Sequence, residues 1–290
     1  MTPTARWEFA AIGTRWHIDT PALLDDDARD AVREVIDRFD RVWSRFRAES
    51  LVSELAGGGD APLPPDAAPM LELYVDLAAA THGAVNPLIG DVLARRGYDP
   101  GYGFVDRGAA AAPADWRRLL RWRDGRLRLD APATIDVGAI GKGRLVDLVL
   151  AALNAVDGPV VVDASGDLAV RGCTQRIGLE HPYDPARAIG VWPVTDAALC
   201  ASAVNRRAWG GVDGSGGLHH VLDARTGEPV RTVAATWAVS SDAMTADAAA
   251  TALFFDGGAR FAHEHGVAWV RMTTDGAVEW SPGCAAELFL

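Results

Sequence analysis

The sequence has few cysteines, no long apolar run and no excess of positive charge. Its 3 cysteines lie far apart and form no CxxC pair, which favours neither a disulfide framework nor a zinc site. No apolar run reaches the roughly 18–20 residues that a membrane span requires. Because the first residues also lack the apolar core of a signal peptide, we expect a cytoplasmic protein without a membrane span.

The charge balance limits the partners that the chain can bind. A formal net charge of −11 at pH 7 argues against nucleic acid or an anionic membrane surface as a general partner. At 290 residues and 49% hydrophobic, the chain is able to bury a large core. An anionic ligand would need local positive charge, which a divalent metal ion and a lysine could supply.

The periodicity of apolar residues indicates the fold class. Alternation across residues 4–20 predicts two strands joined by a Gly-Thr turn, and an apolar stripe from Val32 to Phe46 predicts a helix that begins near residues 25–27. Hairpin-length loops join most predicted strands, which indicates an α+β fold with mixed, mainly antiparallel sheets packed with helices. We expect residues 1–290 to form one large domain or two intimately joined halves. Further helices are expected at 69–81, 144–156 and 244–255, and a surface insertion at 97–114. Further strands are expected at 127–129, 134–137, 177–179, 189–192, 198–202, 267–272 and 277–280, and a hairpin that turns at Ser165 and Gly166 is expected at 160–170.

A carboxylate and a hydroxyl share a helix face near the C-terminus. Asp247 and Thr251 lie four residues apart in the alanine-rich run ADAAAT, which should be helical. Two oxygen ligands at this spacing suit a hard cation such as Mg²⁺. The same pattern also fits an acidic residue near a helix N-terminus followed by an ordinary mid-helix threonine.

The segment DVGAIGKG (Asp136 to Gly143) places one lysine among glycines. Lys142 could reach an anionic ligand while the glycines let the backbone come close. The segment is neither a phosphate-binding P-loop nor a GxGxxG dinucleotide fingerprint, because its glycines stand at other spacings. A tight strand-to-helix turn without a ligand is the alternative interpretation.

A series of motifs, in order along the chain, resembles the FAD:protein FMN transferases of the ApbE family. They are AIGT (Ala11 to Thr14), WSRFRAESLVSEL (Trp43 to Leu55), HGAVNPLIG (His82 to Gly90), DVGAIGKGRLVD (Asp136 to Asp147), VVVDASGDLAVRG (Val160 to Gly172), HHVLDARTG (His219 to Gly227) and ADAAAT (Ala246 to Thr251). The resemblance runs nearly from end to end, and it implies an ApbE-like fold.

The resemblance implies a role for particular residues. Metal ligands would be Asp247, Thr251 and the backbone carbonyl of Ala139. His220 would lie at the reacting phosphate and help to deprotonate an acceptor hydroxyl, for which a near-neutral pKa would suit it. His219 would point to the opposite face of the extended segment. FAD contacts would come from Ile12, Phe46, Ala84, Val85, Asn86, Asp136, Lys142, Asp167 and Val221.

The chain departs from the family pattern at several positions, mostly on the flavin side. Phe46 stands where many members have tyrosine, so ring stacking is retained and a hydroxyl is lost. Asn86 replaces an aspartate and Ser165 replaces a glycine. Ala224 replaces a proline of the HVLDARTG motif.

The function that the resemblance implies is Mg²⁺-dependent transfer of FMN from FAD to a Ser or Thr hydroxyl of an acceptor flavoprotein, with release of AMP. Two alternatives are Mg²⁺-dependent hydrolysis of FAD to FMN and AMP, and binding of FAD without turnover. The retained Asp247, Thr251 and His220 argue against a protein that only binds FAD.

Overall fold

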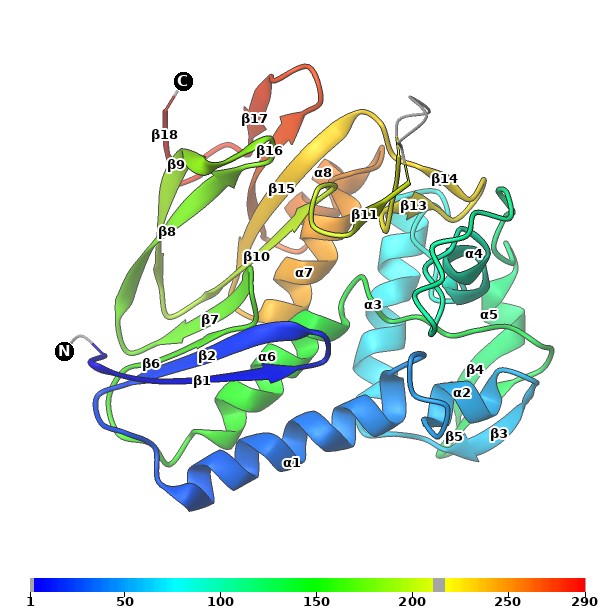
Figure 1. The fold of residues 1–290 in the computed structure, drawn as a ribbon, viewed down its shortest axis with the longest axis horizontal. Helices are drawn as coiled ribbons and strands as arrows, with labels where there is room; N and C mark the ends of the chain where they lie inside the picture. Colours follow the sequence, from blue (N-terminus) through cyan, green and yellow to red (C-terminus); the bar gives the residue numbers. More distant parts are fainter. Residues whose placement is uncertain (1–2, 211–216, 290) are drawn as a thin grey trace.

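An eight-stranded antiparallel sheet forms the largest element of the fold. The computed structural model describes residues 3–210 and 217–289, and its strand order is β1-β2-β6-β7-β10-β15-β16-β17 (Figure 1). The strands are β1 (Ala5–Ala11), β2 (Thr14–Thr20), β6 (Val160–Asp163), β7 (Asp167–Arg171), β10 (Ala198–Ala203), β15 (Val233–Ser240), β16 (Ala268–Thr273) and β17 (Val278–Trp280).

Four smaller sheets among the described residues complete the fold, and in Figure 1 the sheet of β3, β4 and β5 lies beside α2 (Leu51–Leu55) and α5 (Trp116–Leu119), away from the large sheet. One three-stranded sheet has the order β18-β9-β8, and a second has the order β3-β5-β4. Two two-stranded sheets have the orders β11-β12 and β13-β14, and the HHVLDARTG motif runs from the end of β12 to the turn between β13 and β14. The bounds are β3 (Gly59–Pro62), β4 (Leu120–Arg123), β5 (Arg126–Leu129), β8 (Thr174–His181), β9 (Asp184–Thr195), β11 (Ala208–Trp209), β12 (Leu218–His219), β13 (Leu222–Asp223), β14 (Glu228–Pro229) and β18 (Glu287–Leu288).

Helices cover one face of the large sheet. In Figure 1, α6 and α7 stand between the strands and α3, and α1 lies across the end of α6. Alanines make α7 narrow, and Ala246, Ala249 and Ala250 are fully buried, so this helix approaches both the sheet and α6 closely. The helices are α1 (Asp26–Trp43), α2 (Leu51–Leu55), α3 (Ala67–Ala80), α4 (Gly90–Arg95), α5 (Trp116–Leu119), α6 (Gly141–Ala152), α7 (Ala243–Ala252) and α8 (Gly258–Glu264).

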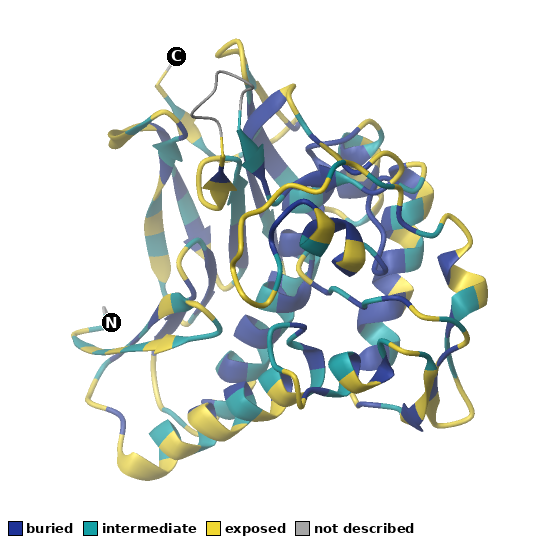
Figure 2. Ribbon diagram, turned by 45° about the vertical axis from the view of Figure 1, so that its right-hand side comes forward, coloured by how far each residue is buried: buried dark blue, intermediate teal, exposed yellow. Residues whose placement is uncertain are grey.

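Helix α1 shows how the sequence pattern directs packing. The side chain of Asp25 accepts a hydrogen bond from the backbone N–H of Ala28 and so caps the first turn. Apolar side chains at helical spacing then form one buried stripe, and the opposite face is exposed along the helix (Figure 2). The buried residues are Val32, Ile36, Phe39 and Trp43.

The predicted α+β class is confirmed, and each predicted helix lies within a few residues of its expected bounds. The strand predicted at 134–137 is wrong, since these residues form no strand. Strand β15 is missing from the predictions because nearly all its residues are buried, so its sequence does not alternate. Within the described ranges, no helix is both long and apolar enough to cross a membrane.

Candidate functional site

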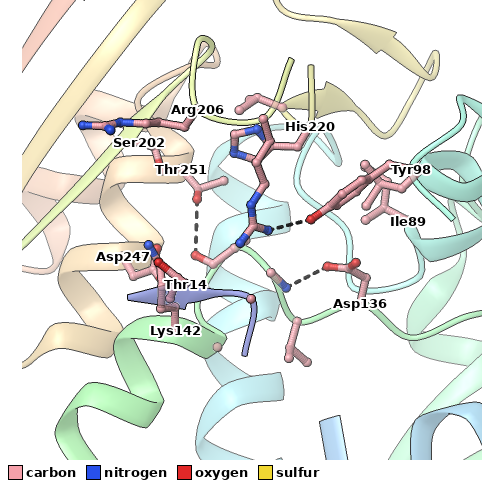
Figure 3. A pocket seen from close by; sticks show the side chains of 18 of the residues that line it. Thr14, Ile89, Tyr98, Asp136, Lys142, Ser202, Arg206, His220, Asp247 and Thr251 are labelled. Carbon is pink, nitrogen blue, oxygen red and sulfur yellow. Dashed lines mark hydrogen bonds between the residues drawn. The ribbon is translucent and has the colours of Figure 1, made fainter. Parts of the chain in front are cut away.

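A large cleft, here called the central cleft, lies beside α6 and α7 and has a volume of about 1080 Å³. The residues that the sequence singles out come from seven separate segments, and nearly all of them line this cleft (Figure 3). Asp167 is the exception, because it is fully buried behind the wall. The predicted residues that line the cleft are Ile12, Phe46, Ala84, Val85, Asn86, Asp136, Ala139, Lys142, His220, Val221, Asp247 and Thr251.

Two turns supply backbone to the wall of the cleft. Ile12 has φ +46° and Gly13 has φ +73°, as the two-residue turn between β1 and β2 requires. A β-branched residue with positive φ is strained, and such strain is concentrated at functional positions. Both polar atoms of the Asn86 side chain form hydrogen bonds with the backbone. Nδ2 donates to the carbonyl of Pro113 over 2.9 Å, and Oδ1 accepts from the N–H of Leu88 over 2.9 Å. Asn86 therefore fixes the turn that presents the Ala84 and Val85 backbone.

Asp136 forms an ion pair with Arg45. The guanidinium Nε of Arg45 donates to Oδ2 of Asp136 over 2.5 Å, while Oδ1 accepts from the N–H of Gly138 over 2.7 Å. A second guanidinium nitrogen of Arg45 donates to the carbonyl of Tyr98. The remaining Nη2 of this buried arginine has no hydrogen-bond partner within the part of the chain that the structure describes. Arg45 was missed by the sequence interpretation, and its partner is 91 residues away.

Aromatic side chains form one wall of the cleft. Phe46 stacks on Tyr102 with ring centroids 5.4 Å apart and meets Tyr98 edge-on at 5.3 Å. Tyr98 also stacks on Trp209, at 5.6 Å. The predicted surface insertion at 97–114 is exposed over residues 100–107, and its aromatic residues Tyr98, Tyr102 and Phe104 also line the cleft. The signal in the sequence was the presence of several aromatic residues in a Gly-rich segment, because a loop that only faces solvent is usually polar.

Helix α7 and the turn that precedes α6 bring three oxygen groups to the cleft. The N–H of Gly143 donates to Oδ2 of Asp247 over 2.9 Å, and Thr251 Oγ1 donates to the carbonyl of Ala139 over 3.3 Å. Figure 3 shows Asp247 and Thr251 beside one another above Lys142. Burial raises the pKa of Asp247 well above its ordinary value, and the nearby Asp167 acts in the same direction, against the charge of Lys142.

This donor set fits Mg²⁺. Asp247 is only 3% exposed, and no basic side chain forms an ion pair with it among the described residues, so a cation would stabilise its charged form. All three groups are hard oxygens. No cluster of three or more His, Cys, Asp or Glu that could hold a metal occurs in residues 3–210 or 217–289. Magnesium commonly takes one or two carboxylates and completes its shell with water and substrate phosphate.

Lys142 already has an anionic partner. Its Nζ lies 2.7 Å from Oδ2 of Asp167, and the two side chains are 26% and 1% exposed. Burial lowers the pKa of Lys142, but the carboxylates of Asp167 and Asp247 outweigh burial, so the net pKa is raised and the lysine is charged. Asp167 would therefore act on a cleft ligand through Lys142.

The two histidines have different surroundings. His219 is buried, and its Nε2 lies 2.8 Å from the carbonyl of Val230. His220 faces the cleft, as Figure 3 shows, and its Nδ1 has no partner among the described residues. The opposite orientations are as expected. The near-neutral pKa expected for His220 is wrong. Burial, assisted by the charge of Arg207, lowers the pKa of His220 to about 3.

The chain belongs to the ApbE family, whose match covers residues 12–271. A protein from Rhodobacter capsulatus described as an FAD:protein FMN transferase is 27% identical over 315 aligned positions. That alignment covers 99% of this chain and 58% of the relative, so the chain spans little more than half of the relative's length.

Solved structures share the fold at low sequence identity. The ApbE protein of Thermotoga maritima superposes with a TM-score of 0.83 at 22% identity, over 96% of this chain and 97% of that chain. The flavinyl transferase ApbE of Pseudomonas stutzeri, in its apo form, gives 0.80 at 20% identity over 97% and 96%. The flavin transferase ApbE of Vibrio cholerae gives 0.77 at 20% identity over 97% and 98%.

Proposed function

We propose that this chain is an Mg²⁺-dependent FAD:protein FMN transferase. The observation that carries the proposal is the buried carboxylate of Asp247, set with Thr251 and the Ala139 carbonyl at a cleft of about 1080 Å³. A cleft of that size accepts a dinucleotide. The name of the Rhodobacter relative supports the same activity.

In the proposed reaction, a Ser or Thr hydroxyl of an acceptor flavoprotein attacks the phosphorus atom on the FMN side of the FAD diphosphate. The new bond joins the acceptor oxygen to phosphorus, and the bond from phosphorus to the bridging oxygen breaks. AMP leaves with that oxygen. The proton of the acceptor hydroxyl passes to the imidazole of His220, which is neutral because its pKa is about 3.

The chain's own groups position the reactants. Asp247, Thr251 and the Ala139 carbonyl would hold Mg²⁺, which lowers the negative charge of the diphosphate and so permits attack. The aromatic wall around Phe46 and Tyr102 suits a flat heteroaromatic ring. Lys142 would stabilise charge beside the diphosphate from its place at the N-terminus of α6.

The proposal is tested with Asp247→Asn, using release of AMP from FAD in the presence of Mg²⁺ and an acceptor flavoprotein. We expect a loss of at least a hundredfold, with binding of FAD in EDTA retained. Asp256→Asn is the matched control, since Asp256 is exposed just beyond α7. Wild-type turnover by Asp247→Asn would contradict the proposal. AMP release that does not depend on the acceptor would indicate hydrolysis, and binding without AMP release would indicate a protein that only binds FAD.

A further inference from the structure

Most charged side chains that line the central cleft form ion pairs, and two of those in the described ranges do not. Four basic residues of the cleft each contact a carboxylate: Arg45 with Asp136 at 2.5 Å, Arg47 with Asp40 at 3.0 Å, Lys142 with Asp167 at 2.7 Å and Arg206 with Glu180 at 2.8 Å. Within residues 3–210 and 217–289, the charged cleft residues that form no ion pair are Asp247 and Arg207. Asp247 fits a cation. Arg207 is the complementary case, a cation that fits an anion.

The surroundings of Arg207 hold it at the cleft. Its Nη1 donates to the hydroxyl of Tyr98 over 2.9 Å, an interaction drawn as the dashed line at Tyr98 in Figure 3. Its guanidinium also lies 5.8 Å from the centroid of the Tyr98 ring. The backbone carbonyl of Arg207 accepts from the N–H of His220 over 3.2 Å, which keeps the two residues adjacent. A guanidinium has five N–H donors, so the bond to Tyr98 leaves most of them available to a ligand.

We infer that Arg207 binds the diphosphate of the dinucleotide substrate, an inference that rests on the proposed function. The charge of an arginine without a carboxylate partner is not neutralised within the protein, so it attracts a bound anion strongly. Its planar guanidinium can also donate hydrogen bonds to two phosphate oxygens at once. Lys142 should contribute less than Arg207 to diphosphate binding, because Asp167 already neutralises the charge of Lys142. The place of Arg207 beside His220 also puts its charge where the P–O bond would break.

The inference is tested by comparing FAD with riboflavin, which has no phosphate, by fluorescence titration in EDTA so that no metal-dependent turnover occurs. Arg207→Gln should weaken FAD binding by about ten- to hundredfold, in keeping with a charge-assisted contact, and riboflavin binding by less than about threefold. The FAD affinity of Arg207→Lys should lie between those of the wild type and Arg207→Gln, because lysine keeps the positive charge but cannot donate two parallel hydrogen bonds. The matched control is Arg176→Gln, because Arg176 lies outside the cleft lining, is 59% exposed and is paired with Glu287. It should leave the ratio of FAD to riboflavin affinity within about threefold of wild type.

An unchanged ratio of FAD to riboflavin affinity in Arg207→Gln would overturn the inference while leaving the proposed function intact. A raised KM for the acceptor protein in the same variant would then assign Arg207 to the acceptor. Failure of the wild-type chain to release AMP from FAD with Mg²⁺ and acceptor would instead remove the proposed function. Circular dichroism of each variant verifies that exposed Arg207 can be replaced without loss of the fold.

Discussion

Gly143 on α6 donates its backbone N–H to the carboxylate of Asp247 on α7 over 2.9 Å, and the two helices touch at this point. A Cβ atom on Gly143 would lie 2.1 Å from the carbonyl oxygen of Ala243 and 2.7 Å from Cβ of Asp247. The absence of a side chain at residue 143 thus permits the contact that orients the proposed metal ligand.

Gly143→Ala should therefore force α6 and α7 apart. We expect a loss of roughly 1–3 kcal/mol in unfolding free energy, as overpacking typically costs, and a loss of most AMP release. Urea unfolding and an AMP assay measure the two effects. Gly178→Ala is the control, because a Cβ there meets no atom within 4 Å. Equal activity in the two variants would contradict the account of this helix contact.

Asp147 is expected to position α7 from its place on α6. Its two carboxylate oxygens accept from the N–H groups of Ala243 and Met244 at 2.7 and 2.9 Å, which caps the first turn of α7. Asp147→Asn retains one acceptor, so we expect about 1–2 kcal/mol of destabilisation and a severalfold higher Mg²⁺ concentration for half-maximal activity. The exposed Asp157→Asn is the control. A fall in kcat with unchanged Mg²⁺ dependence would argue for a different role.

The ion pair of Lys142 and Asp167 gives a prediction about stability. Lys142→Met leaves the buried Asp167 carboxylate without its partner, which should cost about 3 kcal/mol in unfolding free energy. The double variant Lys142→Met, Asp167→Asn removes both charges and should recover most of that loss. A double variant no more stable than the single variant in urea unfolding would show that the pair does not govern stability.

Protonation of His220 should destabilise the fold on acidification. The folded chain binds a proton on this imidazole only near pH 3, whereas the unfolded chain binds one below about pH 6.5. Between these values the unfolded state binds more protons, so stability falls as the pH falls. His220→Gln should reduce the loss between pH 7 and pH 4.5 by on the order of 2 kcal/mol.

The measurement is urea unfolding at both pH values, with His263→Gln as an exposed control. Burial raises the pKa of Asp147 to about 6, which acts with the opposite sign, but Asp147 is present in all three proteins and so cancels in the difference. An NMR titration of His220 with a midpoint near pH 6.5 would contradict the account.

Local patterns in the sequence predicted the fold class and most of the cleft. The spacing of Asp247 and Thr251 on one helix face, and the glycines around Lys142, depend on short-range geometry and were visible directly. Resemblance to family motifs supplied the distant segments, such as those of Ile12 and His220, and both line the cleft.

Relationships between distant residues could not be predicted. Arg45 pairs with Asp136, and Arg207 bonds to the hydroxyl of Tyr98, across separations of 91 and 109 residues. No periodicity encodes such contacts, because they depend on how the elements pack. The low pKa of His220 was missed for the same reason, since burial is a property of the folded chain.

The most direct test of the central claim is intact-mass analysis of an acceptor flavoprotein after incubation with this chain, FAD and Mg²⁺. The account predicts that the acceptor gains the mass of one FMN less one water, that an equal amount of AMP is released, and that replacing the target Ser or Thr by Ala or adding EDTA abolishes both. AMP release with no change in acceptor mass, or mass gain that persists in Asp247→Asn, would contradict it.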